Sequence, residues 1–161
     1  MSEPLDRPSE DPRLLDPDIE APAPDGHPRP TLPHALAVFV GGSVGTMARY
    51  GVTANVHLMA RSFPWTIMTI NVTGALLLGV LGGSVFAARP DAVTLRLFLG
   101  AGVLGGWTTY SSIIAGLLTL AHLGSWGMAT LNLLAALLMP VAAASVGLVV
   151  GSALLRNRIA P

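Results

Sequence analysis

The longest charge-free segment of the chain sets the strongest limit on its fold. Residues 97–155 are 59 consecutive positions without Asp, Glu, Lys or Arg. One helical crossing of a bilayer takes about 20 apolar residues, so this segment is long enough for two crossings. Between its halves stands Gly124-Ser125-Trp126-Gly127, a turn composition with a tryptophan suited to the membrane interface. The segment therefore predicts transmembrane helices over 94–122 and 127–154.

Two further apolar segments precede this one. Residues 64–88 carry no charge, open with Pro64 at a plausible first helical position, and end at Arg89. Residues 35–59 carry one charge, Arg49. Only 11% of all residues are charged, against about 25% in soluble domains, which favours lipid as the solvent. The predicted fold class is an all-α membrane protein with four transmembrane helices.

The first 33 residues differ in composition from the rest of the chain. They contain nine of the 13 prolines and eight of the nine acidic residues. Such a segment buries too little apolar surface to offset the entropy of ordering, so we predict a disordered, acidic, proline-rich tail over 1–33. It lacks the basic start and apolar stretch of a signal peptide. Residues 34–156 are then the membrane domain, and 157–161 are a short C-terminal tail.

The arginines predict how the chain lies in the membrane. Four spans place both termini on one side, and basic residues are enriched in cytoplasmic loops. Among the arginines near the ends of the spans, and apart from Arg49, one lies on the opposite side, Arg61, whereas five lie on the side of the termini: Arg29, Arg89, Arg96, Arg156 and Arg158. We expect a multi-pass protein of the plasma membrane with cytoplasmic termini.

Glycines recur four residues apart within the predicted spans. The pairs are Gly41 and Gly45, Gly79 and Gly83, and Gly102 and Gly106. Small residues at this spacing let helix backbones approach closely in a membrane. The pattern predicts a compact bundle or a dimer.

The composition argues against several classes of chemistry. There is no cysteine, and the four histidines lack the spacing of metal ligands. Glycine-rich stretches at 41–45 and 100–105 match short enzyme motifs, but both lie inside apolar spans rather than between a strand and a helix. No Asp or Glu lies within a span, which removes the usual carriers of proton coupling and favours passive conduction. We expect no enzyme activity and no nucleic-acid partner.

Residues 105–112 form the most informative segment and lie in the middle of the third span. Two glycines followed by four Ser and Thr side chains are unusual in a lipid-facing helix, so we predict that the helix is broken there. Backbone groups freed at membrane depth must be satisfied by protein or by an ion. Carbonyl oxygens near Gly105 and Thr108 are suitable ligands for a small hard cation. The alternative is a kink in which Thr108 and Thr109 bond back to the chain.

Asn71 is the one strongly polar side chain in the middle of the second span. An amide in hydrocarbon is costly unless it is hydrogen-bonded, so it must face another helix or a wet path. Two interpretations stay open: a contact that holds two helices together, and a ligand whose amide hydrogens replace water around an anion.

Three blocks of the sequence, in order, resemble the CrcB/Fluc family of fluoride channels. The blocks are GGSVGTMARY at 41–50, NVTGALLLG at 71–79 and GGWTTYSS at 105–112. The resemblance extends over residues 35–155. It implies a dimer of antiparallel subunits with two fluoride pores, in which the third helix is broken and a structural Na⁺ lies at the dimer centre.

The resemblance also implies roles for individual residues. Asn71 matches the pore asparagine of the family, and Tyr110 and Ile113 match two pore-lining phenylalanines. Aromatic ring edges are positive, so they can partly replace the hydration shell of an anion. The predicted site comprises Asn71, Tyr110, Ser111, Ser112 and Ile113 on the fluoride path, the carbonyls of Gly105 and Thr108 at the sodium ion, and Arg49 as a structural residue.

The chain departs from the family pattern at several positions. Ile113 offers no ring edge, and Tyr110 adds a hydroxyl group. Polar residues that the family often has are replaced by Ile67, Ala75 and Ala136, and Asn132 stands where the family often has tyrosine. These losses, with the arginine bias, suggest the hypothesis that the chain pairs with a second, homologous subunit of opposite orientation.

The function that we predict is passive, fluoride-selective export across the plasma membrane, by a homodimer or by such a heterodimer. One alternative is a non-conducting structural subunit of a heterodimeric channel. Another is a small four-helix multidrug transporter, which would need a membrane-embedded carboxylate to couple protons.

Overall fold

The fold is known from a computed structural model that describes residues 31–54 and 63–159. Every regular element in these ranges is helical. Four helical segments are long and apolar enough to cross a membrane: Leu32–Thr53, Trp65–Phe86, Val93–His122 and Trp126–Asn157. The predicted four-span, all-helical fold is thereby confirmed for the described residues. Most of the predicted tail, and the end of the predicted first span, lie outside them.

The first span is α1 (Leu32–Thr53), which starts three residues before the predicted position 35. Thr31 precedes it with extended backbone, and its N–H donates to Nδ1 of His34 at 3.3 Å. The His34 N–H donates to the Thr31 carbonyl at 2.9 Å. Pro33 lies in the first turn, where a missing N–H costs no hydrogen bond. The end of the proline-rich segment is therefore used to start the helix.

The second span consists of α2 (Trp65–Leu81) and a π-helical turn, η2 (Gly82–Phe86). Pro64 takes the position before the first helical residue, and its carbonyl accepts the N–H of Met68 at 3.1 Å. Helical geometry continues to residue 88, as predicted.

Four helical pieces make up the third span. They are α3 (Val93–Arg96), the π-helical η3 (Leu97–Leu104), α4 (Gly105–Trp107) and α5 (Ser111–His122). Residues 108–110 are not helical, and Thr108 is extended, with φ −76° and ψ 156°. Gly105 and Gly106, the first residues of the segment 105–112 in which we expected the break, are still helical, so the interruption begins after Trp107.

A tight turn joins the third span to α6 (Trp126–Ile159). Gly124 has φ 72°, a left-handed conformation that costs glycine little. The N–H of Gly124 donates to the Ala121 carbonyl and that of Ser125 to the Leu120 carbonyl, both at 2.9 Å, which is the Schellman pattern. At its far end α6 continues past the predicted residue 154, because Arg156 lies in the helix rather than stopping it.

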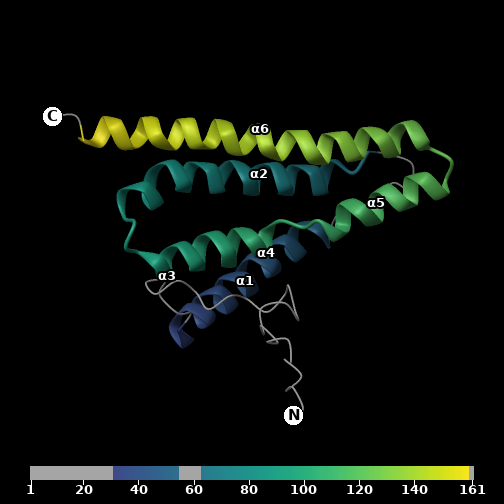
Figure 1. The fold of residues 1–161 in the computed structure, drawn as a ribbon. Coiled ribbons are helices and arrows are strands. Elements are labelled where there is room, and N and C mark those ends of the chain that lie inside the picture. The colour runs from purple at the N-terminus through teal and green to yellow at the C-terminus, as the bar shows by residue number, and fades with distance from the viewer. Residues whose placement is uncertain (1–30, 55–62, 160–161) are drawn as a thin grey trace, which may run out of the picture. The chain divides into compact units, whose positions relative to one another are not determined.

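The spans pack as two pairs, the second span with the fourth and the first span with the third. In Figure 1, α2 lies along α6, while α1 packs against η3 and α4. Glycines allow both close approaches. A Cβ atom on Gly45 would collide with the Val103 carbonyl, and a Cβ on Gly79 with the Ala144 carbonyl. Close backbone packing, as the glycine spacing predicted, therefore holds both pairs together.

The buried core is small and lies toward the end of the bundle where α5 meets α2 and α6. Its largest fully buried side chains are Met68, Ile70 and Asn132. Most other large apolar side chains are exposed on the single chain; Phe39, for example, is 71% exposed. Such a surface suits lipid or a partner subunit rather than water.

The packing of α1 predicts that Gly45→Ala lowers stability. The new methyl group would meet the Val103 carbonyl and the Trp107 nitrogen, which are backbone atoms that cannot rotate away. Overpacking of this kind costs about 1–3 kcal/mol. Thermal unfolding of the purified chain in detergent should show a lower Tm. Gly42→Ala is the control, because no atom lies within 4 Å of its added methyl; equal Tm values for the two variants would contradict the prediction.

Candidate functional site

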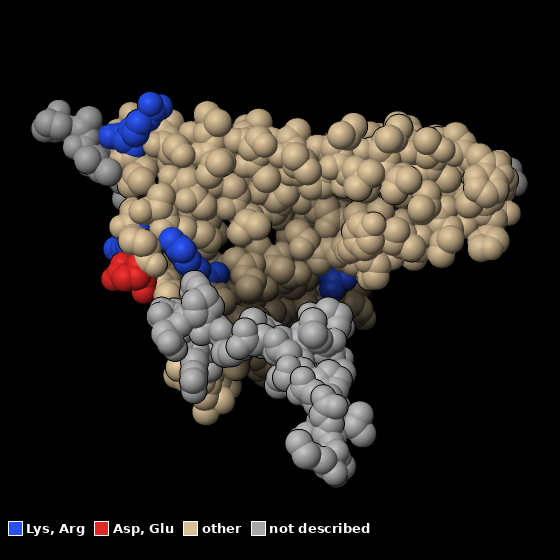
Figure 2. Space-filling view, viewed as in Figure 1, with Lys and Arg blue, Asp and Glu red and all other residues tan. Residues whose placement is uncertain are grey.

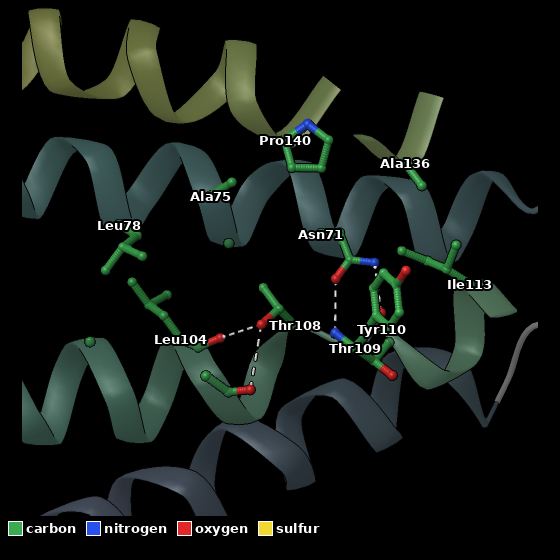
Figure 3. A pocket seen from close by; sticks show the side chains of 13 residues that line it. Asn71, Ala75, Leu78, Leu104, Thr108, Thr109, Tyr110, Ile113, Ala136 and Pro140 are labelled. Carbon is green, nitrogen blue, oxygen red and sulfur yellow. Dashed lines mark hydrogen bonds between the residues drawn. The ribbon is translucent and has the colours of Figure 1, made fainter. Parts of the chain in front are cut away.

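The third span leaves helical geometry at Thr108, where several bonds close the end of α4. The Thr108 N–H donates to the Leu104 carbonyl at 3.0 Å. The Thr108 hydroxyl donates to the same carbonyl at 3.1 Å and to the Gly105 carbonyl at 3.4 Å, as Figure 3 shows. Thr108 thus bonds back to the chain, as the kink alternative expected, but its own backbone is extended and α5 begins only at Ser111.

Asn71 binds both backbone groups of Thr109. Its Nδ2 donates to the Thr109 carbonyl at 3.0 Å, and the Thr109 N–H donates to its Oδ1 at 2.8 Å. Asn71 is 6% exposed, so these bonds form away from solvent. The second helix therefore supplies the two hydrogen bonds that Thr109 loses by leaving the helix. The other N–H of the Asn71 amide makes no hydrogen bond within the described residues, so it can bind another group.

The start of α5 is organised by the Thr109 hydroxyl. It lies 3.3 Å from the Ser111 hydroxyl and 3.1 Å from the Ser112 hydroxyl, and it accepts the Ser112 N–H at 3.4 Å. This arrangement resembles a helix N-cap, in which a side-chain oxygen accepts a backbone N–H in the first turn. Ser111 and Ser112, which we predicted on the fluoride path, are thus hydrogen-bonded to the Thr109 hydroxyl at the start of α5.

The opposite side of α4 is held by α1 and α2. The Gly106 carbonyl accepts Nε of Arg49 at 3.1 Å and the Thr46 hydroxyl at 3.4 Å. Nε1 of Trp107 donates to the Thr73 hydroxyl at 3.2 Å. The Arg49 side chain therefore links α1 to α4. Its positive charge lies at the carbonyl end of the helical segment, where the helix dipole is negative.

A cavity of about 350 Å³ opens beside residues 108–110 and is drawn in Figure 3. It brings together five of the predicted site residues: Asn71, Gly105, Thr108, Tyr110 and Ile113. The others, Ser111, Ser112 and Arg49, are not among its lining residues. The other lining residues come from α2, from the third span and from α6: Gly74, Ala75, Leu78, Gly100, Leu104, Thr109, Ala136 and Pro140. The cavity is therefore largely apolar, and its polar side chains are those of Asn71, Thr108, Thr109 and Tyr110.

The positions that depart from the family pattern fall into two groups. Ala75 and Ala136 line the cavity, so methyl groups stand where hydroxyl groups would face it. Ile67 and Asn132 are instead buried outside it. Nδ2 of Asn132 donates to the Ile113 carbonyl at 3.3 Å, whereas its Oδ1 has no hydrogen-bond partner in the described part of the chain.

Sequence reasoning missed Trp107, Thr73, Gly74 and Pro140 as parts of this site. Gly74 lies one turn after Asn71, and a Cβ there would collide with the Thr108 methyl and crowd the Trp107 ring. The signal was present in the spacing, since positions i and i+3 share one helix face. Pro140 stands out in the sequence as the one proline inside the fourth apolar segment.

The residues that could hold a cation offer oxygen atoms from the backbone. Within the described ranges no group of three or more His, Cys, Asp or Glu side chains could hold a metal ion. The Thr108 carbonyl accepts no hydrogen bond in these ranges, and the Gly105 carbonyl accepts one long bond from the Thr108 hydroxyl. These neutral oxygen donors fit a small hard cation, but two are too few to complete its shell, so a second set of donors is needed.

Comparison with known proteins assigns the chain to a family. Residues 36–148 match the sequence model of the family described as CrcB-like protein, Camphor Resistance (CrcB). The chain is 41% identical over 127 residues to a protein of Rhodospirillum centenum, and the match covers 78% of this chain and 97% of that protein. It is 36% identical over 115 residues to a protein of Agrobacterium fabrum, and that match covers 71% of this chain and 92% of the relative. Each of these relatives is named a fluoride-specific ion channel. The chain therefore belongs to the CrcB family.

Proposed function

We propose that this protein is a fluoride-specific ion channel that lets fluoride leave the cell passively across the plasma membrane. The observation that carries the proposal is the non-helical segment 108–110, which Asn71 holds beside a largely apolar cavity. Its relatives of similar length are named for this function. A channel makes and breaks no covalent bond, so no catalytic residue is needed.

The cavity offers an anion a few weak partners. The free N–H of Asn71 can donate a hydrogen bond, and the edge of the Tyr110 ring can present its positive rim. Weak partners of this kind replace water without holding the ion too tightly to leave. No Asp or Glu lies in the described spans, so proton coupling through a carboxylate is not part of the mechanism.

The working unit in this proposal is a dimer of antiparallel subunits. A two-fold axis beside Thr108 would bring two copies of the Gly105 and Thr108 carbonyls around one Na⁺. That arrangement supplies the second set of donors that a single chain lacks. A cation at this place would lower the cost of holding fluoride in a low-dielectric passage. In this proposal the interruption after Trp107 is the mid-membrane break of the third span.

The identity of the partner subunit remains a separate question with its own test. In a homodimer the chain must insert in both orientations, whereas the arginine bias favours cytoplasmic termini. A heterodimer would pair it with a homologous subunit that inserts the other way. Expressing the chain alone and measuring both fluoride conduction and the side of its termini separates the two. Full conduction by the lone chain in both orientations contradicts the heterodimer.

The basic test is fluoride efflux from liposomes that contain the purified protein. We expect selective fluoride leak with no chloride leak. A multidrug transporter would instead move drugs in a proton-dependent way, and a non-conducting subunit would release neither ion, whether alone or with a homologous partner subunit. Either result would overturn the proposal.

Asn71→Ala should slow fluoride efflux by about tenfold or more, because it removes the free N–H and leaves both backbone groups of Thr109 unpaired, at about 1–3 kcal/mol for each buried group. Asn157→Ala is the matched control: it removes the same amide from an exposed position on α6, away from the cavity. Efflux rates that are equal for the two variants would mean that Asn71 has no role in conduction.

Tyr110→Phe should keep efflux within about twofold of the original protein, whereas Tyr110→Ala should lower it by about tenfold, since the proposed partner is the ring edge, worth about 0.5–1.5 kcal/mol per contact. The Tyr110 hydroxyl makes no hydrogen bond in the described residues, so its loss breaks none there. The assay is the same liposome efflux. Loss of activity in the Phe variant would assign the role to the hydroxyl instead.

Removing sodium tests the proposed cation site. Purification and assay with N-methylglucamine in place of Na⁺ should reduce fluoride efflux, and adding Na⁺ back should restore it. Thr108→Ala should keep its dependence on Na⁺, because the substitution removes the hydroxyl but leaves the carbonyl that would bind the ion. Unchanged efflux after complete exchange would exclude a required sodium ion.

A further inference from the structure

The second and fourth spans are held together by glycines up to a definite point. A Cβ on Gly79 or Gly83 would collide with backbone of α6, and a Cβ on Gly147 or Gly151 with backbone of α2. The two backbones are therefore in contact along this stretch. The last members of the series are Gly83 and Gly151, and beyond them larger side chains follow on both helices.

A second cavity, of about 400 Å³, begins where this glycine contact ends. It is lined by Ser84, Val85, Ala88 and Arg89 from the end of the second span, and by Leu154 and Leu155 from α6. The same stretch of the second span contains η2, whose π-helical turn is wider than an α-helical one. The Ser84 hydroxyl bonds to the Val80 carbonyl of its own helix at 2.5 Å and so does not reach across the gap.

Arg89 is the one charged group on this cavity and is exposed. Its guanidinium makes no hydrogen bond or ion pair within the described ranges, although Asp91 is two residues away, and only its backbone is bonded, to Val85 and Ala92. Arg96, by contrast, donates to the Phe86 carbonyl at 2.7 Å and lies over the Phe86 ring at 5.8 Å. In Figure 2, basic residues gather at this end of the spans. The Arg89 charge is therefore available to a ligand.

We propose that this cavity binds an anionic phospholipid from the surrounding bilayer. The phosphate of the head group pairs with the guanidinium of Arg89, and an acyl chain lies against Val85, Leu154 and Leu155. Arg89 is three residues beyond the apolar span that ends at Phe86, while Leu154 and Leu155 lie in the last turns of the fourth span. The cavity thus spans the boundary between head groups and hydrocarbon.

A lipid fits the cavity better than other ligands because the lining combines a charged arginine with apolar side chains. A soluble phosphate would use the arginine but not the apolar side chains, and a neutral lipid would use the apolar side chains but not the arginine. Basic pockets between transmembrane helices are suited to anionic head groups. The site is separate from the cavity beside Asn71, so this proposal does not depend on the channel function.

The test uses the full-length protein in detergent, titrated with phosphatidylglycerol or with phosphatidylcholine of the same acyl chains and followed by native mass spectrometry. We expect tighter binding of phosphatidylglycerol, and about fivefold weaker binding of it by Arg89→Gln, the effect of one basic residue near an anionic surface. Binding of phosphatidylcholine should not change. Arg156→Gln is the matched control, because it removes a charge at the same end that does not line the cavity.

A second variant tests the apolar part of the site. Ala88→Trp keeps Arg89 but fills the cavity from an exposed position, so it should also weaken the binding of phosphatidylglycerol. Equal losses for Arg89→Gln and Arg156→Gln would show a general surface charge and overturn the proposal. Unchanged binding in Ala88→Trp, or competition by inorganic phosphate at the same concentration as the lipid, would show an anion site without an acyl-chain groove and would overturn it too.

Discussion

The site depends on one pair of hydrogen bonds, those between the Asn71 amide and the backbone of Thr109. A peptide unit that leaves a helix inside a membrane has no water to bond with, and each unpaired group costs several kcal/mol. Asn71 meets both needs at once, with Oδ1 accepting the N–H and Nδ2 donating to the carbonyl. No side chain without both a donor and an acceptor could do this. The extended backbone of Thr108 persists because the residue after it is held from another helix.

Close packing on both sides places the third span where Asn71 can reach it. Gly41 and Gly45 bring α1 against η3 and α4, and Gly74 lets Trp107 and Thr108 lie against α2. A methyl group at Gly41 or Gly45 would collide with backbone of the third span, and one at Gly74 would collide with the Thr108 side chain and crowd the Trp107 ring. Glycine packing and the Asn71 contact are thus two parts of one arrangement, because the second fails when the first is loosened.

The sequence predicted the spans well, since charge-free segments and their bounding turns are set by the cost of charge in lipid. It predicted the helix ends less well. α1 begins at Leu32 because Thr31 and His34 organise its first turn, and α6 runs to Ile159 because an arginine can extend toward the interface without ending a helix. The bonding partner of Asn71 could not be predicted, because it depends on how two helices are placed in three dimensions. Of the two interpretations of Asn71 left open by the sequence, the structure shows the contact that holds two helices together, whereas the role as an anion ligand stays a prediction.

The departures from the family pattern change what the cavity can offer an ion. Ala75, Ala136 and Ile113 present only hydrocarbon to it, so no hydroxyl group at these three positions can replace the water that fluoride would shed. In the proposed channel, the remaining favourable contacts would be the Asn71 N–H, the Tyr110 ring edge and the field of the proposed cation. A weak contact with an anion matters more in such a cavity than in water, because the surrounding dielectric is lower. In this proposal, the loss of hydroxyl groups places a larger share of fluoride stabilisation on Asn71. Because Asn71 also holds Thr109, the proposal couples conduction and local structure through a single side chain.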